Sequence, residues 1–244
     1  MTLMLLTRPE PDAQASLQRL NALGIQAISE PLMVRQTLET SLPPADGFAA
    51  MALTSVNGLR ALADRGQLQD FIDLPVYAVG ARTAFEAQAA GFTKVFDAGG
   101  TLDELINILS RAGLDGPVFY PAARHLSGDL AKALSPFGVM VVTSRIYEMV
   151  AVDSISQGLV TALENREIGA ALFYSRRTAE IFVALMETRL DKSARSALAI
   201  LCLSEGVAEP LMAAHFNRIS LADRPDEEAM MALALAFARE QDPS

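Results

Sequence analysis

An arginine stands at the end of the first apolar run of this sequence. Arg8 follows the apolar residues 3–6, and Pro9 after it favours an extended backbone at that point. A guanidinium group can bind a carboxylate through two parallel hydrogen bonds. Arg8 could therefore hold an anionic ligand, and an ion pair on the protein surface is the alternative.

A second polar segment, residues 121–129, follows the apolar residues 118–120. Its side chains include Arg124, His125 and Ser127, and all three could reach an anionic ligand. Ser127 could instead cap the helix that we expect to follow. The segment thus indicates the same chemistry as the first arginine.

Three further turns carry a hydroxyl group or a glycine at the start of an expected helix. Ser55 and Ser175 each follow an apolar run and precede a helical pattern, so each could be only an N-cap. Gly80 follows residues 75–79 and would let an anion approach the backbone N–H groups of its turn. If the two serine turns face one another, they strengthen the hypothesis of a ligand site.

Tyr147 lies in an extended stretch, residues 145–150, that lacks a helical apolar pattern. Its phenol could donate a proton or a hydrogen bond to a ligand. The same side chain could instead pack between two strands. Taken without further information, the residues favour packing.

Motifs for nucleotides, metals and catalytic triads are missing from the sequence. Position 80 lacks the other glycines of a dinucleotide-binding turn, and no Gly-x-x-x-x-Gly-Lys-Ser/Thr segment occurs. Two histidines and the single Cys202 fit neither a metal site nor a triad. The acidic run 226–228 fits the first turn of a helix and indicates no chemistry. We therefore expect no cofactor.

The composition is that of a folded protein with a moderate number of charges. The 244 residues are 51% hydrophobic and 20% charged, which supplies enough apolar material for a core. A net charge of −9 disfavours binding to nucleic-acid phosphates, and no apolar stretch approaches the roughly 18 residues of a membrane span. Without a signal-peptide pattern, we expect a cytoplasmic protein that binds neither nucleic acid nor membrane.

Short apolar runs alternate with helical patterns along the whole chain. The runs expected as strands are residues 3–7, 25–31, 48–53, 75–79, 118–120, 139–143, 170–173 and 198–203. Strands separated by helices of about 10 residues predict parallel sheets with helices on both faces, the doubly wound α/β class. Such sheets bind ligands where strands end and helices begin, and the polar turns lie at those points.

An internal duplication relates two parts of the chain. Gly24 and Gly138 each separate a helical pattern from a strand, 114 positions apart, and Ser55 and Ser175 open helices 120 positions apart. The nearly constant offset predicts two similar α/β lobes.

The lobes could follow one another in the chain or be interleaved. In the interleaved arrangement, the N-terminal β-α-β unit would join the C-terminal third. Residues 32–36 and 145–150 are extended and fall outside the helix alternation, so they would be the crossing points and could pair as a ribbon. Periodicity does not choose between the two arrangements.

Taken together, the motifs resemble those of the uroporphyrinogen-III synthase family, almost from end to end of the chain. The motifs that carry the resemblance are Leu6-Thr7-Arg8-Pro9, Leu23-Gly24, Pro31-Leu32, Leu53-Thr54-Ser55-Val56-Asn57, Ala78-Val79-Gly80-Ala81-Arg82-Thr83-Ala84, Ala90-Gly91-Phe92, Pro121 with Arg124 and Asp129-Leu130, Ile146-Tyr147, and Phe173-Tyr174-Ser175. Their order and spacing are more specific than any single motif.

The resemblance implies two doubly wound parallel-sheet lobes, joined by a two-stranded ribbon, with the substrate bound in the cleft between them. Lobe 1 would comprise residues 1–33 and 152–244, lobe 2 residues 38–145, and the ribbon residues 34–37 and 146–151. The implied reaction cyclises linear hydroxymethylbilane, a small-molecule linear tetrapyrrole, with loss of water. Ring D is inverted through a spiro intermediate, which gives uroporphyrinogen III for haem biosynthesis.

This reaction suits a protein without a cofactor. The pyrrole nitrogens stabilise the cation that remains when the hydroxyl leaves, so neither a metal nor a redox group is needed. The protein must chiefly hold the chain in shape, and positioning can lower a barrier by ~7–11 kcal/mol in favourable cases. We expect a monomer.

The resemblance also implies roles for individual residues. Tyr147 matches the tyrosine that assists hydroxyl loss as an acid or hydrogen-bond donor. The substrate carries many carboxylates, and the residues expected to bind them are Thr7, Arg8, Ser55, Gly80, Arg82, Thr83, Arg124, Ser127 and Ser175. Where many relatives have Gly-Pro-Thr-Thr-Ala, this chain has Ser204-Glu205-Gly206-Val207-Ala208. Glu205 would repel a carboxylate there, so Ser204 is the hydroxyl that we expect to contribute.

A non-catalytic protein is the alternative. Two α/β lobes that close on a small anion could form a regulatory binding module, which would need no catalytic tyrosine. Such a regulator normally requires a partner or a DNA-binding domain, and two lobes fill the 244 residues. We therefore expect the synthase.

Overall fold

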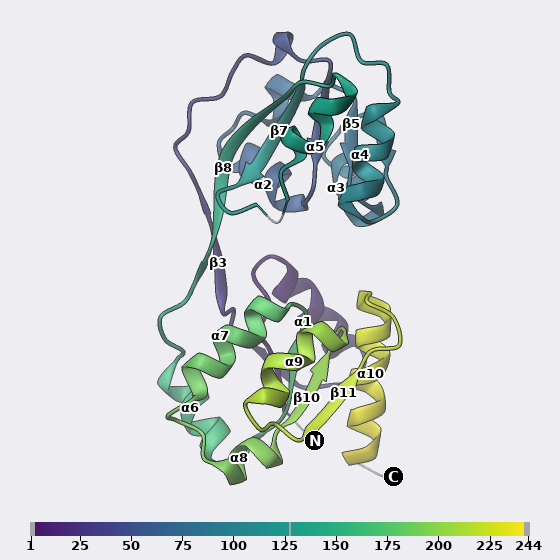
Figure 1. The fold of residues 1–244 in the computed structure, drawn as a ribbon. Helices are drawn as coiled ribbons and strands as arrows, with labels where there is room; N and C mark the ends of the chain where they lie inside the picture. Colours follow the sequence, from purple (N-terminus) through teal and green to yellow (C-terminus); the bar gives the residue numbers. More distant parts are fainter. Residues whose placement is uncertain (1–2, 127, 242–244) are drawn as a thin grey trace. The chain divides into compact units, whose positions relative to one another are not determined.

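The computed structural model describes residues 3–126 and 128–241, and the chain forms two compact units. Unit 1 combines Met1–Val34 with Val150–Ser244, and unit 2 is Arg35–Met149. The N-terminal strands share a sheet with strands from the C-terminal third, so the chain path is interleaved (Figure 1). Each unit is a largely parallel sheet with helices on both faces, which confirms the predicted doubly wound α/β class.

Unit 1 is built on a five-stranded parallel sheet in the order β11-β10-β9-β1-β2. Its strands are β1 (Leu3–Leu6), β2 (Ala27–Ser29), β9 (Ile168–Phe173), β10 (Ala199–Cys202) and β11 (Arg218–Leu221). Its helices are α1 (Asp12–Ala22), α6 (Gln157–Glu164), α7 (Arg176–Met186), α8 (Lys192–Ala197), α9 (Glu205–Ala213) and α10 (Glu227–Gln241). Helices α6, α7, α8 and α9 pack on one face, and α1 and α10 pack on the other.

Unit 2 is built on a six-stranded sheet in the order β3-β8-β7-β4-β5-β6. Its strands are β3 (Met33–Thr37), β4 (Ala50–Leu53), β5 (Val76–Ala78), β6 (Val95–Asp97), β7 (Val118–Ala123) and β8 (Val141–Ala151). Its α-helices are α2 (Val56–Asp64), α3 (Ala81–Ala89), α4 (Leu102–Ser110) and α5 (Leu130–Leu134), with short 3₁₀ turns at Ala45–Gly47, Leu68–Phe71 and Ser135–Phe137. Helices α2 and α3 pack on one face, and α4 and α5 pack on the other (Figure 1).

The two units repeat one strand order in a permuted chain. Strands β2-β1-β9-β10-β11 of unit 1 correspond in order to β8-β7-β4-β5-β6 of unit 2. Ser55 and Ser175 are both helix N-caps with extended backbones, and Gly24 and Gly138 both have left-handed backbones with φ of 77° and 74°. The structure therefore confirms the internal duplication.

Strands β3 and β8 form the predicted two-stranded ribbon. The Leu38 N–H donates to the Ile146 carbonyl at 2.8 Å, and the Val152 N–H donates to the Leu32 carbonyl at 3.1 Å. The residue numbers along β3 rise as those of their partners in β8 fall, so the two strands are antiparallel. The strand expected at 139–143 and the extended stretch at 145–150 are parts of the single strand β8. The exact lobe and ribbon boundaries stay a prediction.

Burial explains which strands the sequence predicts. All four residues of β4 are buried, as are all four of β10, and both were expected from their apolar runs. Strands β6 and β11 lie at the edges of their sheets, are largely exposed and carry no apolar run, so they were not expected.

No helix among the residues that the structure describes is long and apolar enough to cross a membrane.

Candidate functional site

Each sheet contains one point at which the strand order reverses. In unit 1 it lies between β1 and β9, and in unit 2 between β7 and β4. Ligands of open parallel sheets bind outside the carboxyl ends of the strands at such switch points. The predicted residues that directly follow these four strands are Thr7, Arg8, Ser55, Arg124 and Ser175.

Ser55 lies at the end of β4, beside the phenol of Tyr147. It is the N-cap of α2, and its hydroxyl oxygen accepts a hydrogen bond from the Asn57 N–H at 3.2 Å. The same side chain lies beside the Tyr147 phenol, where it lowers the pKa of that group. The turn that caps α2 therefore also lies next to the phenol that the sequence offered as a proton or hydrogen-bond donor.

A bulge in β8 brings Tyr147 to this turn. Ala122 of β7 pairs with Arg145, but Ala123 pairs with Tyr147, so Ile146 is an extra residue in β8. A bulge re-aims the side chains that follow it. As a result Ile146 and Tyr147 are adjacent in sequence and yet both pack in the core that contains Phe119.

The environment of Tyr147 keeps its phenol protonated. The side chain is 5% exposed, and burial raises the pKa of the phenol above its usual value near 10. The Ser55 side chain lowers this pKa, Tyr120 raises it further, and Arg35 lowers it by a smaller amount. At neutral pH the group is a hydrogen-bond donor set in an apolar core.

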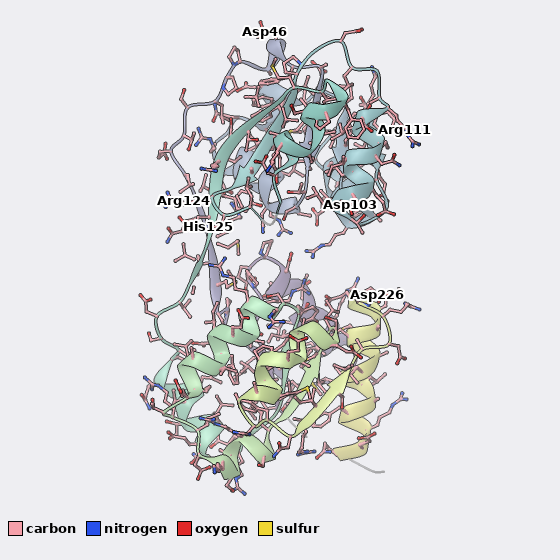
Figure 2. All side chains as sticks on the ribbon, viewed as in Figure 1. Asp46, Asp103, Arg111, Arg124, His125 and Asp226 are labelled. Carbon is pink, nitrogen blue, oxygen red and sulfur yellow. The ribbon has the colours of Figure 1, made fainter. Side chains whose placement is uncertain are left out.

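Arg124 and His125 share one acidic partner. Arg124 Nη1 lies 2.8 Å from Glu148 Oε2, and His125 Nε2 lies 3.6 Å from Glu148 Oε1. The backbone N–H of Arg124 donates to the Tyr147 carbonyl at 2.8 Å, which ties this segment to β8. Figure 2 shows both basic residues on the segment that follows β7. Ser127 lies outside the residues that the structure describes.

The glycine turn of unit 2 has the expected strand–turn–helix form. Gly80 is the N-cap of α3, with an extended backbone, and Ser204 holds the equivalent position before α9. Arg82 is exposed in the first turn of α3, whereas Thr83 is 5% exposed. The predicted ligand contacts of these four residues stay predictions.

Arg8 lies in a buried network in unit 1. Its guanidinium donates to Ser16 Oγ at 2.8 Å, forms an ion pair with Glu227, and lies 4.1 Å above the ring of Tyr174. A second ion pair joins it to Asp12 at 3.4 Å. Arg8 is 9% exposed, so its ion pairs are buried. The predicted alternative, an ion pair on the protein surface, is therefore wrong. The carboxylate partner was missed, since the acidic run 226–228 was expected only to begin a helix.

Two other hydroxyl residues of unit 1 make structural hydrogen bonds. Thr7 is fully buried, and its hydroxyl donates to the Leu172 carbonyl at 2.8 Å, which links β1 to β9. Ser175 caps α7 by accepting from the Thr178 N–H at 3.1 Å. These bonds give each residue a role in the fold, and their predicted contacts with a ligand stay predictions.

Sequence reasoning also missed a second phenol at the switch point of unit 2. The Tyr120 hydroxyl of β7 is hydrogen-bonded to Thr54 Oγ1, after β4, at 2.8 Å. Two adjacent hydroxyl residues at the end of β4 and a tyrosine within the expected strand 118–120 were the available signal.

Within residues 3–126 and 128–241, no group of three or more His, Cys, Asp or Glu side chains could hold a metal ion.

Fold and site together define a protein of two doubly wound α/β units, each with hydroxyl and cationic side chains at its switch point. A family model described as uroporphyrinogen-III synthase HemD matches residues 14–232. The chain therefore belongs to the uroporphyrinogen-III synthase family, whose members are cyclising lyases of haem biosynthesis.

Solved structures of two bacterial relatives share the fold. Uroporphyrinogen-III synthetase from Helicobacter pylori is 20% identical with a TM-score of 0.67, over 97% of this chain and 100% of that one. A mutant uroporphyrinogen III synthase from Thermus thermophilus is 18% identical with a TM-score of 0.52, over 99% of this chain and 100% of that one. Among curated protein sequences, no significant match was found.

Proposed function

We propose that this uroporphyrinogen-III synthase uses the switch point of unit 2 to convert hydroxymethylbilane into uroporphyrinogen III. The observation that carries the proposal is the Tyr147 phenol, which the bulge in β8 places in a buried position beside Ser55 at the end of β4. A protonated hydrogen-bond donor at the ligand-binding edge of a parallel sheet is what departure of a hydroxyl group requires.

The reaction needs one proton at its first step and returns one at its last. The C–O bond of the terminal hydroxymethyl group breaks, the oxygen leaves as water, and a pyrrole nitrogen stabilises the resulting cation. The substituted carbon of ring D attacks this cation and forms the spiro intermediate. Rearrangement then inverts ring D, closes the macrocycle and releases a proton, so that water is the only by-product.

Tyr147 assists the first step. Because burial raises its pKa, the phenol keeps its proton until the C–O bond breaks; it donates a hydrogen bond to the departing oxygen, passes the proton to it as water leaves, and regains a proton when the last step releases one. Ser55 stabilises the charge that develops on the phenol oxygen when the proton moves toward the leaving group. The Ser55 side chain lowers the pKa of the phenol and the surrounding core raises it, so the two tune the donor in opposite directions.

The substrate carboxylates are bound by hydroxyl and cationic side chains and by backbone N–H groups at the turns that follow the strands. Arg124 is an accessible cation near Tyr147, with a side chain that is 52% exposed, and it exchanges Glu148 for a substrate carboxylate. Arg8 is engaged by Glu227 and acts chiefly through the shape of its turn. The complete proposed set is Thr7, Arg8, Ser55, Gly80, Arg82, Thr83, Arg124, Ser127, Ser175 and Ser204.

In this proposal the protein works as a cytoplasmic monomer, without a cofactor and without a nucleic-acid partner. The cofactor-free chemistry is supported by the pyrrole nitrogens, which supply the charge stabilisation that a metal would otherwise provide. Residues 34–37 and 146–151 act as a connecting ribbon between lobe 1, residues 1–33 with 152–244, and lobe 2, residues 38–145.

A coupled assay tests this function. Hydroxymethylbilane is generated in situ, the protein is added with a metal chelator, and the oxidised porphyrin isomers are separated by chromatography. We expect type III to predominate over the type I isomer that forms by spontaneous closure. Type I alone, from protein with intact circular dichroism, would contradict the proposal and favour the anion-binding regulator.

A further inference from the structure

We propose that Tyr120 is a positioning residue for this reaction, which holds Thr54 so that the adjacent Ser55 hydroxyl stays directed at the Tyr147 phenol. The inference rests on the proposed function of Tyr147. It adds a second tyrosine and a threonine to the site, neither of which was expected from the sequence.

The first observation is the hydrogen bond between Tyr120 and Thr54. The phenol oxygen and Thr54 Oγ1 are 2.8 Å apart, and Tyr120 is 4% exposed. The ladder between β4 and β7 pairs Ala50 with Val118 and Met51 with Phe119, and this side-chain bond joins the two segments further along. A buried hydrogen bond of this kind restricts the turn that follows β4.

The second observation is the arrangement of the two phenols on opposite faces of one sheet. Tyr120 packs in the core formed with α4 and α5, whereas Tyr147 packs in the core formed with α2 and α3. Thr54 is hydrogen-bonded to the first phenol and Ser55 lies beside the second, because consecutive residues of an extended chain point to opposite faces. A movement of Thr54 is therefore transmitted directly to Ser55.

The third observation is that β7 supports the same turn at a second point. A Cβ added to Gly58, in the first turn of α2, would lie 2.6 Å from the Pro121 carbonyl oxygen. Glycine thus allows the start of α2 to rest on the residue next to Tyr120. The backbone contact sets the position of the helix, and the Tyr120 hydroxyl sets the orientation of the turn before it.

The variant Tyr120→Phe removes the hydroxyl and keeps the ring. We expect kcat for type III formation to fall by about fivefold, the loss that corresponds to one neutral hydrogen bond, while KM changes less than about twofold. Thr54→Val should reproduce this fall and Thr54→Ser should restore most of the activity. Tyr77→Phe is the matched control, because Tyr77 is a buried tyrosine of the same core and should leave kcat unchanged.

A double-mutant cycle separates positioning from a general effect on the fold. If Tyr120 acts through Tyr147, adding Tyr120→Phe to Tyr147→Phe should not lower kcat further. An unchanged kcat in Tyr120→Phe, or a fivefold loss that persists in the Tyr147→Phe background, would overturn the inference. Absence of type III product with the unmodified protein would instead contradict the proposed function itself.

Discussion

Arg8 and Glu227 lie 219 residues apart in the sequence, and their side chains form an ion pair inside unit 1. The pair fastens the turn after β1 to the start of α10. Ser16 donates to the other Glu227 oxygen at 2.6 Å, and the Tyr174 hydroxyl donates to that oxygen at 3.4 Å. One carboxylate therefore organises the switch point of this unit.

Removing this charge should destabilise unit 1. Glu227→Gln leaves the buried guanidinium of Arg8 with only its longer ion pair to Asp12, and we expect the free energy of unfolding to fall by about 2 kcal/mol. Urea denaturation measures the change. Glu228→Gln is the matched control, because that side chain is 84% exposed and its loss should cost under about 0.5 kcal/mol. Equal effects of the two substitutions would contradict the structural role of the pair.

Gly58 should tolerate no side chain. In Gly58→Ala the new methyl group must displace either α2 or the backbone of Pro121, so we expect a loss of ~1–3 kcal/mol in unfolding free energy and a lower kcat. Gly158→Ala in α6 is the control, since nothing lies within 4 Å of its added Cβ and alanine should stabilise that helix slightly. Thermal unfolding and the coupled assay measure both effects. Full activity and stability in Gly58→Ala would show that the contact with Pro121 is unimportant.

The tyrosines should make the protein sensitive to alkali. Burial raises the pKa of all four, so the folded protein retains phenol protons that the unfolded chain releases above about pH 10. Their contribution to stability is complete below that pH and is lost as the pH rises toward the folded pKa values, by up to ~1.4 kcal/mol per pH unit for each phenol. Urea titrations at about pH 8 and about pH 11 measure the loss. Equal stability at both values would contradict the predicted shifts.

Cys202 should be inert in the folded protein. The thiol is fully buried in β10, and burial raises its pKa to about 12. A thiol reagent at neutral pH should react only as the protein unfolds, with a urea dependence that matches the loss of circular dichroism. Rapid reaction with the native protein would show that this core opens locally.

The sequence predicted the buried strands and the polar turns, but not the pairing of side chains across the fold. Apolar runs marked β4 and β10 because those strands are covered on both faces. A carboxylate 219 positions from Arg8 carries no local signal, so Glu227 could not be chosen among the acidic residues.

The site of unit 2 shows the same limit. An extended stretch around Tyr147 was evident, but the bulge that aligns this residue with Ala123 depends on the register of β7 with β8. The bond between Tyr120 and Thr54 likewise depends on β4 and β7 being neighbours, although β5 and β6 separate them in the chain. Strand order and register are properties of the folded sheet, and the residues that rely on them were the ones missed.

The most direct test of the role of Tyr147 is the kcat of Tyr147→Phe in the coupled assay, measured beside Tyr77→Phe. Loss of the hydrogen bond to the departing hydroxyl should lower kcat by about 10- to 100-fold with little change in KM, while circular dichroism and the Tyr77→Phe control stay at the level of the unmodified protein. An unchanged kcat in folded Tyr147→Phe would remove the phenol from the reaction and leave the switch point of unit 2 without its proposed donor.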